Sequence, residues 1–252
     1  MTVASPLLSD ADPAPVEVVP GAPGAPVVFV CEHAGRIVPN RLKNLGVVPG
    51  VLNSHRGWDI GAVDVARQLA SLLDAPLVLQ RYSRLVIDSN RPPNSVASIP
   101  EISDGETIPG NVGLSLAARE ARIEEIFAPM DRAIDELFEA EPRRAGLSIH
   151  SFTPNLGGLP RPWHAGFLSR RDPSTAKALH DAVAAMRPDL TLGINEPYQI
   201  EDETDWFVPR HAETRGLRHC LIEIRNDQLP DEAAAEEWAD LLAQAIRPVV
   251  GW

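Results

Sequence analysis

Short apolar runs alternate with amphipathic helical segments along most of this 252-residue chain, and this alternation is the feature that most limits its fold. Val27–Cys31 is a continuous apolar run bounded by turn residues, which is typical of a strand buried on both faces. Asp59–Leu73 carries apolar residues at a helical period and polar residues on the opposite side. Strands that alternate with helices predict an α/β fold with a mostly parallel or mixed central sheet and helices on both faces.

The rest of the chain continues this alternation. Further strands are expected at residues 77–79, 85–87, 147–150, 190–194 and 220–224, and further helices at 114–140, 174–186 and 231–246. Pro129 is expected to kink or split the longest helix, because proline cannot donate the helical hydrogen bond. Residues 92–112 contain four prolines and are expected to form a long loop of the kind that is often functional. Residues 1–25, rich in Pro, Ala, Gly and Asp, are expected to be an extended or disordered lead-in to a single domain over 26–252.

Composition narrows the classes of function. The net charge of −12 argues against a nucleic-acid surface, which needs a basic field, but a local arginine cluster still permits a small anionic ligand. Cys31 and Cys220 lie in apolar runs and are expected to be buried thiols rather than a disulfide. The sequence has no apolar stretch long enough to span a membrane and no secretory signal, so the cytoplasm is the expected location.

Polar residues recur at the carboxyl ends of the expected strands, where ligands bind in open α/β sheets. His33 and His150 each follow a strand directly, and Asp59 precedes a helix at the same expected edge. A catalytic zinc takes three protein ligands from His, Asp and Glu, which makes these three residues candidates. Two imidazoles that share an ion must lie within roughly 7 Å, because metal–ligand bonds are about 2 Å long.

Structural roles compete with the metal hypothesis. A histidine at a strand end is more often hydrogen-bonded structure than a ligand, and Asp59 suits a helix N-cap. Five other histidines also compete as ligands: His55, His164, His180, His211 and His219.

Two further groups carry chemistry. Arg84 and Arg91 flank an apolar run, and a planar guanidinium can bind a substrate carboxylate through two parallel hydrogen bonds. The competing interpretation pairs Arg84 with Asp88 as a surface ion pair. Glu223 lies within an apolar strand, where burial raises the pKa of a carboxyl group and suits it to proton transfer. Arg225 follows at the same strand end and is a candidate for substrate binding.

Six sequence blocks together resemble the N-formylglutamate amidohydrolase family. They are CEHAG at 31–35, HRGWDIGA at 55–62, YSRLVIDSNR at 82–91, SIHSFTP at 148–154, INEPY at 194–198 and IEIRNDQ at 222–228. The segments SIHS, IDSNR and IEIRND also resemble parts of zinc carboxypeptidases and their aspartoacylase relatives. The resemblance implies the zinc exopeptidase (phosphorylase/hydrolase-like) fold and a single zinc ion, although this ligand set accepts other divalent metals.

The resemblance also implies residue roles. The metal ligands would be His33, Asp59 and His150, and the catalytic carboxylate would be Glu223. Asn90 and Arg91 would hold the substrate carboxylate, while Arg84 or His211 would stabilise the oxyanion. Family enzymes carry Pro-His-Ser-Gly where this chain carries Glu32-His33-Ala34-Gly35, so Glu32 is a further candidate for the metal shell.

The predicted function is metal-dependent hydrolysis of a small N-acyl amino acid, such as N-formylglutamate, by activated water with a glutamate proton shuttle. Two alternatives stay open at this point. One is a carboxypeptidase-like enzyme or cell-wall peptide amidase that uses the same site on a larger substrate. The other is a metal-free protein that binds an anion on the same fold.

Overall fold

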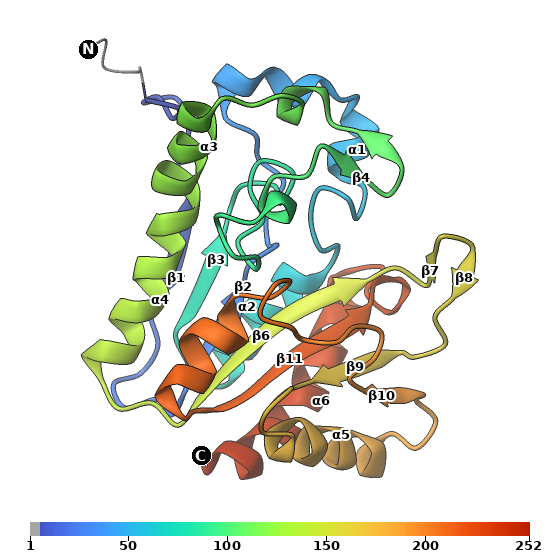
Figure 1. Cartoon of the computed structure of the whole chain (residues 1–252). Coiled ribbons are helices and arrows are strands. Elements are labelled where there is room, and N and C mark those ends of the chain that lie inside the picture. Colours follow the sequence, from blue (N-terminus) through green and yellow to red (C-terminus); the bar gives the residue numbers. More distant parts are fainter. Residues whose placement is uncertain (1–5) are drawn as a thin grey trace.

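The central sheet is built mainly from the apolar runs of the sequence (Figure 1). The computed structural model describes residues 6–252. Within them, seven strands form this sheet in the order β1-β3-β2-β6-β11-β9-β10. Their bounds are β1 Val16–Val19, β2 Val27–Cys31, β3 Leu77–Gln80, β6 Ala145–Phe152, β9 Ala165–Leu168, β10 Leu192–Ile194 and β11 Arg218–Arg225.

Strand direction is mixed, as expected. Strands β3, β2, β6 and β11 run parallel to one another, whereas β1 pairs antiparallel with β3 at one edge. On the other side, β9 pairs antiparallel with β11 and parallel with β10. The central strands β2 and β6 are buried along their whole length, which explains the continuous apolar run of β2.

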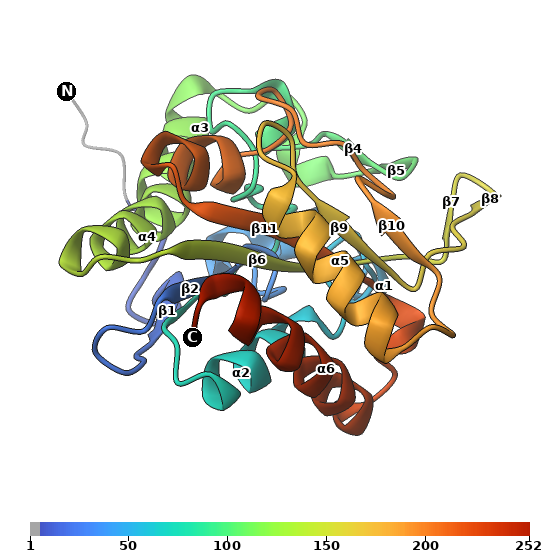
Figure 2. The ribbon, with the colours of Figure 1, turned by 90° about the horizontal axis from the view of Figure 1, so that it is seen from below.

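Helices cover both faces of the sheet (Figure 2). Their bounds are α1 Pro49–Asn53, α2 Ala62–Leu72, α3 Leu116–Arg122, α4 Ala128–Ala140, α5 Ser174–Met186 and α6 Glu232–Val250. Helices α2, α5 and α6 share one core with residues such as Phe29, Leu147 and Ile222. Helix α4 packs on the opposite face, where Met130 and Ile134 meet Val28, Val30 and Leu221. The predicted α/β architecture, a single domain with a mixed sheet, is therefore confirmed.

One expected strand was wrong. Leu85–Ile87 is a buried turn rather than a strand, because the Val86 amide donates to the Ser83 carbonyl at 2.9 Å. The expected lead-in contains β1, whose Glu17 is bonded by Arg67 and Arg81. Residues 1–5 of that lead-in lie outside the described residues.

The proline-rich and glycine-rich loops also contain structure that the sequence pattern did not indicate. Residues 92–112 include a small hairpin, β4 (Ile102–Ser103) and β5 (Glu106–Thr107). A second hairpin, β7 (Asn155–Leu156) and β8 (Leu159–Pro160), follows β6. The helix expected at 114–140 is divided by a π-helical turn at Ile123–Phe127, just before Pro129, as the proline predicts.

Two further expectations concern the cysteines and the membrane. Cys31 and Cys220 are both buried free thiols, as predicted. Within residues 6–252, no helix combines the length and the apolar character needed to cross a bilayer.

Candidate active site

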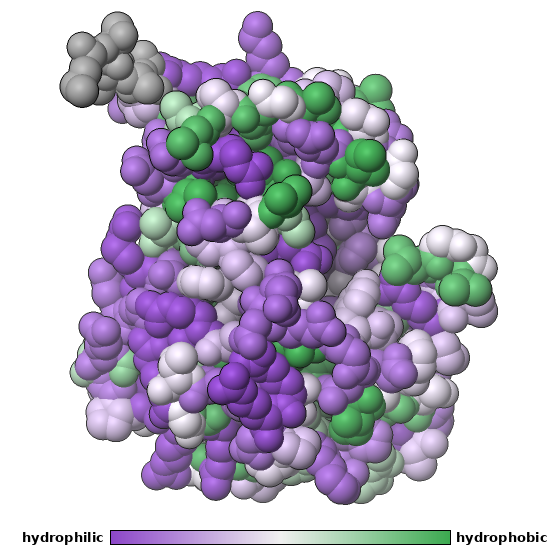
Figure 3. Space-filling view, viewed as in Figure 1, coloured by the Kyte–Doolittle hydropathy of each residue, from purple (hydrophilic) through white to green (hydrophobic). Residues whose placement is uncertain are grey.

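A cavity of about 1080 Å³ opens at the carboxyl ends of β2, β6 and β11. Its floor includes His150 and Glu223 from the sheet, and its walls include the segments 96–104 and 197–205. Figure 3 shows the surface hollowed between the upper loops around β4 and the projecting β7–β8 hairpin. Polar residues that lie far apart in the sequence therefore meet here, at the sheet edge where an α/β fold binds ligands.

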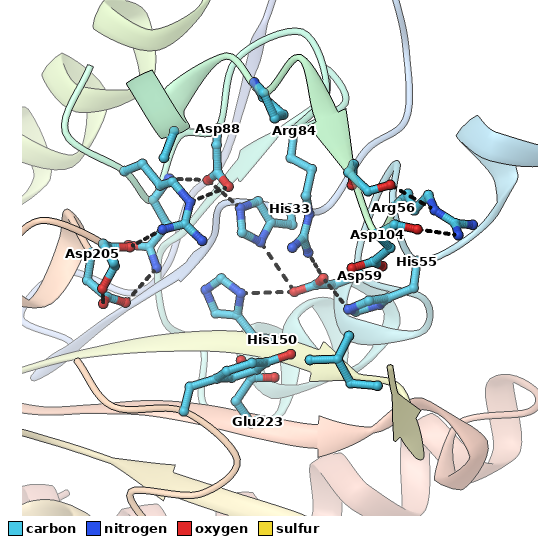
Figure 4. A pocket seen from close by; sticks show the side chains of 18 of the residues that line it. His33, His55, Arg56, Asp59, Arg84, Asp88, Asp104, His150, Asp205 and Glu223 are labelled. Carbon is cyan, nitrogen blue, oxygen red and sulfur yellow. Dashed lines mark hydrogen bonds and ion pairs between the residues drawn. The ribbon is translucent and has the colours of Figure 1, made fainter. Parts of the chain in front are cut away.

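His33, Asp59 and His150 converge within this cavity (Figure 4). One ligand atom from each residue lies within 4.8 Å of the others, and all three residues are buried. The imidazole rings of His33 and His150 have centroids 4.8 Å apart, well within the separation that one shared ion allows. The three residues expected from the sequence thus form a candidate metal site.

Backbone contacts fix the position of Asp59. Its amide donates to the His33 carbonyl at 3.0 Å, which ties the start of α2 to the end of β2. The Ser151 amide donates to Asp59 Oδ2 at 3.2 Å. Gly61 has a φ of 81°, and a Cβ there would lie 2.5 Å from Leu229 Cβ, so this turn requires glycine. Asp59 does not cap α2 with its side chain, because the carboxylate faces the histidines instead.

Each histidine is held from behind by a second carboxylate. His33 Nε2 lies 2.7 Å from Asp88 Oδ1, and His150 Nε2 lies 3.1 Å from Glu32 Oε2. Glu32 also accepts a hydrogen bond of 2.6 Å from the Ser148 hydroxyl. Carboxylates bonded to the far ring nitrogen orient metal-binding histidines and raise their basicity. Glu32 accordingly supports His150 from outside the three-residue cluster.

The protonation state of His33 suits a cation. Burial and the charge of Arg84 lower the pKa of His33 to about 4, so this ring is neutral near pH 7. A neutral ring that donates its Nε2 proton to Asp88 keeps a lone pair on Nδ1, and that atom faces Asp59 Oδ2 at 3.4 Å. Although burial opposes it, Glu32 raises the pKa of His150, so this imidazole must release its Nδ1 proton before that nitrogen can bind a cation.

One orphaned polar atom points to the same conclusion. His33 Nδ1 is buried without a hydrogen-bond partner among residues 6–252, whereas Asp59 Oδ1 has the Arg84 guanidinium against it. A lone pair that faces a carboxylate is unfavourable unless a cation lies between them. The residues present therefore fit a divalent metal with nitrogen and oxygen ligands.

Glu223 stands beside the cluster on β11. It is the register partner of His150 on the neighbouring parallel strand, so both side chains emerge on the same face of the sheet. It is 6% exposed, and its Oε2 has no hydrogen-bond partner within the described chain. Burial raises the pKa of Glu223 to about 7, against the charges of His150, Arg84 and Arg161. A carboxyl group with this pKa can both accept and release a proton near neutrality.

Arg84 and His55 approach Asp59 from the cavity. The Arg84 guanidinium contacts Asp59 Oδ1, and its side chain is 22% exposed, so it is not a surface partner of Asp88. His55 Nε2 lies 3.7 Å from the same oxygen. Burial and the charge of Arg84 lower the pKa of His55 to about 2, so this imidazole is neutral.

Asn90 and Arg91 line the cavity but bind the protein itself. Asn90 Oδ1 accepts hydrogen bonds from the amides of Trp206 and Phe207, and its Nδ2 donates to Asp205. Arg91 lies 3.4 Å from Asp88 and donates to the Thr204 carbonyl at 3.2 Å. Both side chains fasten the 204–207 segment to the turn at 88–91.

The structure does not bring His211 or Arg225 to this cavity. His211 is buried between Asp131 and Asp135 of α4, at 2.8 and 3.1 Å. Arg225 bonds Asp227 at 2.7 Å and the carbonyls of Arg161 and Pro162. Among the described residues, the histidines that line the cavity are His33, His55 and His150.

Arg161 and Tyr198 also line the cavity, and residue patterns had not singled them out. Arg161 follows the β7–β8 hairpin, and Tyr198 lies in an irregular segment after β10. Neither segment has a helical or strand period that would indicate where its side chains point. The INEPY block at 194–198, which contains Tyr198, was the available signal.

Comparison with known proteins identifies relatives of the whole chain. Residues 25–229 match the family described as N-formylglutamate amidohydrolase. The crystal structure of gene product Atu2144 from Agrobacterium tumefaciens is similar, with 36% identity, coverage of 97% of this chain and 98% of that chain, and a TM-score of 0.91. N-formylglutamate amidohydrolase from Ralstonia eutropha JMP134 shares the fold, with 17% identity, coverage of 94% and 96%, and a TM-score of 0.65. No curated protein matches the sequence. The match over residues 25–229 shows that this chain belongs to the N-formylglutamate amidohydrolase family.

Proposed function

We propose that this protein hydrolyses the amide bond of a small N-acyl amino acid, using one zinc ion held by His33, Asp59 and His150. The observation that carries the proposal is the convergence of two carboxylate-backed imidazoles and Asp59 within 4.8 Å, next to a buried Glu223. Membership of an amidohydrolase family supports hydrolysis of an amide. N-formylglutamate is the first substrate to test, because the relative from Ralstonia eutropha bears that name.

The ligand set determines what a bound ion contributes. A divalent cation held by two imidazoles and a carboxylate supplies Lewis-acid chemistry, activating water towards deprotonation and polarising an amide carbonyl. Asp88 and Glu32 keep the two imidazoles in the orientation that this requires. Zinc suits these ligands, as do other divalent first-row metals.

Glu223 is the proposed proton carrier. As the base, it accepts a proton from the attacking water, and as the acid it then delivers that proton to the departing amine nitrogen. Its position opposite His150 supports this role, since both groups face the same cavity. Its elevated pKa supports it further, because proton gain and loss are then nearly balanced at neutral pH.

Arg84 is the proposed donor to the oxyanion that forms when water adds to the carbonyl carbon. It reaches Asp59 from the cavity side, and its Nε has no hydrogen-bond partner among residues 6–252. A charge-assisted donor already in place favours the charge that develops in the transition state.

The cavity supports a small substrate. Its volume of about 1080 Å³ is near the upper end of small-molecule sites. Residues 96–104, from the loop between Pro92 and Val112, form part of its wall. The cavity therefore has room for an acylated amino acid, with this loop along one side.

The test separates metal binding from proton transfer. Zinc content and turnover of N-formyl-L-glutamate are measured in the wild type, in Glu223→Gln and in His150→Ala. We expect Glu223→Gln to bind zinc normally but to lose about 10²- to 10⁴-fold in kcat, the usual contribution of a general base. His150→Ala should lose both zinc and activity.

Two results would contradict the proposal. Wild-type turnover in Glu223→Gln would show that Glu223 is not the proton carrier. Failure of the wild type to bind a divalent metal would contradict metal-dependent hydrolysis and favour a metal-free anion-binding protein. Lys177→Gln, an exposed change on α5 away from the cavity, serves as the matched control and should retain both properties.

A further inference from the structure

Arg161 is an arginine of the cavity that has no carboxylate partner within residues 6–252. The arginines that line the cavity within residues 6–252 are Arg56, Arg84, Arg91 and Arg161. Arg84 pairs with Asp59, and Arg91 pairs with Asp88. Arg56 donates to the carbonyls of Ser103 and Asp104 at 3.2 Å. Among the described residues, no carboxylate lies within ion-pair distance of Arg161, although Arg161 is only 7% exposed.

Its surroundings hold the Arg161 guanidinium in one orientation. Nη1 donates to the Tyr198 hydroxyl at 2.6 Å. The guanidinium carbon lies 5.7 Å from the Phe152 ring centre and 5.1 Å from that of Tyr198. The Arg161 amide donates to the Pro154 carbonyl at 2.8 Å, which closes the β7–β8 hairpin. A buried and preorganised fork of N–H donors without an anion is suited to binding a planar carboxylate.

Arg91, by contrast, lies in an acidic corner. Its Nε is 3.4 Å from Asp88 Oδ2, and Nδ2 of the neighbouring Asn90 side chain donates to Asp205 Oδ1 at 3.3 Å. Asp88 Oδ1 also accepts from His33 Nε2 at 2.7 Å and from the Asn90 backbone amide at 2.9 Å, which is the environment of a carboxylate. A substrate carboxylate at Arg91 would stand beside this negative charge, and like charges at such a distance repel. The Asn90 side chain is already bonded to the 205–207 segment.

We therefore propose that Arg161, with the Tyr198 hydroxyl, holds the α-carboxylate of the substrate and selects for it, whereas Asn90 and Arg91 fasten the cavity wall. This inference rests on the proposed amide hydrolysis and names its specificity-determining residue. Arg161 lines the same cavity as Glu223, and its carbonyl accepts from Arg225, two residues further along β11, at 3.1 Å. An α-carboxylate is the group of an N-acyl amino acid that is nearest the scissile bond.

The experiment compares two substrates that differ only at this carboxylate. The zinc-loaded protein is assayed with N-formyl-L-glutamate and with N-formyl-L-isoglutamine, in which the α-carboxylate is an amide. We expect the wild type to prefer the acid by about 100-fold in kcat/KM, the typical effect of losing one partner of a buried charge pair. Arg161→Met should reduce this preference at least about tenfold, mainly through KM.

Further variants separate specificity from folding. Tyr198→Phe keeps the aromatic ring and should reduce the preference about threefold, as expected for one lost hydrogen bond. Arg161→Lys keeps the positive charge but loses the paired N–H donors of the guanidinium. If Arg161→Met does not fold, the same comparison of substrates is made with Arg161→Lys. Arg171→Met, at a side chain that is 72% exposed, is the control and should keep the full preference.

The outcomes are distinct. A full preference in Arg161→Met, or its loss in Arg91→Met alone, overturns the assignment while leaving the hydrolase intact. If the zinc-loaded protein hydrolyses neither compound, the proposed function fails, and calorimetric binding of N-formyl-L-glutamate then tests the carboxylate site alone. Saturable binding that Arg161→Met abolishes supports the site, and absence of binding to the wild type overturns it.

Discussion

Replacement of Asp88 tests whether His33 is held as a metal ligand or as ordinary buried structure. Asp88 Oδ1 accepts from His33 Nε2 at 2.7 Å and from the Asn90 amide at 2.9 Å. Asp88→Ala removes the carboxylate that orients the ring, whereas His33, Asp59 and His150 all remain. If His33 binds a metal through Nδ1, the loss of this support must weaken metal binding although no ligand has changed.

The size of the effect follows from the type of hydrogen bond. A hydrogen bond to a charged group is worth about 1.5–3 kcal/mol, which corresponds to roughly 10- to 100-fold in Kd. Asp88→Asn keeps an acceptor and loses only the charge, so we expect a loss of about tenfold or less. The two substitutions should therefore form a graded series, with alanine weaker than asparagine and asparagine weaker than the wild type.

Zinc affinity is measured by competition with a chromophoric chelator, and zinc-dependent stabilisation by urea unfolding. At a fixed saturating concentration of zinc, each tenfold loss of affinity should reduce the stabilisation by about 1.4 kcal/mol. Asp189→Ala removes an exposed carboxylate that pairs with Arg187, and it should leave the affinity unchanged. If Asp88→Ala binds zinc within about twofold of the wild type while His33→Ala does not bind, the orienting role of Asp88 is refuted.

Two further predictions concern stability. The hydrogen bond from Arg67, opposed by burial and supported by Arg81, lowers the pKa of Glu17 from 4.5 to about 2. The stabilisation is complete above pH 4.5 and disappears as the pH falls from 4.5 to about 2. Glu17→Gln should lower the free energy of unfolding at pH 7 by about 1 kcal/mol, a small value because the ion pair is partly exposed. The difference between wild type and variant should be smaller at pH 3, and an equal difference at pH 3 and pH 7 would contradict this. Gly61→Ala should cost at least about 2 kcal/mol in urea unfolding, because a strained φ is combined with a clash against Leu229. Gly24→Ala, with a φ of 77° but open space around it, should cost only about 1 kcal/mol, and equal losses at both positions would exclude the clash.

Much of the fold could be predicted because its main elements have strong local patterns. Helix α5 begins and ends at the expected residues, Ser174 and Met186, and β2 occupies the whole apolar run at 27–31. Leu85–Ile87 shows where such patterns fail, since three buried apolar residues in a turn look like a short buried strand. Strand β1 is also invisible locally, because its place depends on pairing with β3, some sixty residues along the chain.

The site was predictable where a strand positions the residue. His33, His150 and Glu223 lie in or directly after central strands, and the carboxyl ends of those strands meet at one edge. Arg161 lies in an irregular segment, so its direction depends on contacts with Phe152 and Tyr198 that no period reveals. His211 bonds Asp131 and Asp135, one helical turn apart on α4, instead of facing the cavity. The sequence could not reveal this, because it depends on where α4 packs against the sheet.

The pairing of β6 with β11 keeps His150 and Glu223 opposite each other through eight consecutive register partners. Residues 153–217, which connect these strands, include the β7–β8 hairpin, Arg161 and Tyr198. Insertions in this connection can therefore reshape what the cavity admits without moving the proposed proton carrier, Glu223, relative to the proposed metal ligand, His150. A shift of one position within either strand would instead turn one of the two side chains to the opposite face of the sheet. The connection can thus change the shape of the cavity while the two strands keep His150 and Glu223 side by side.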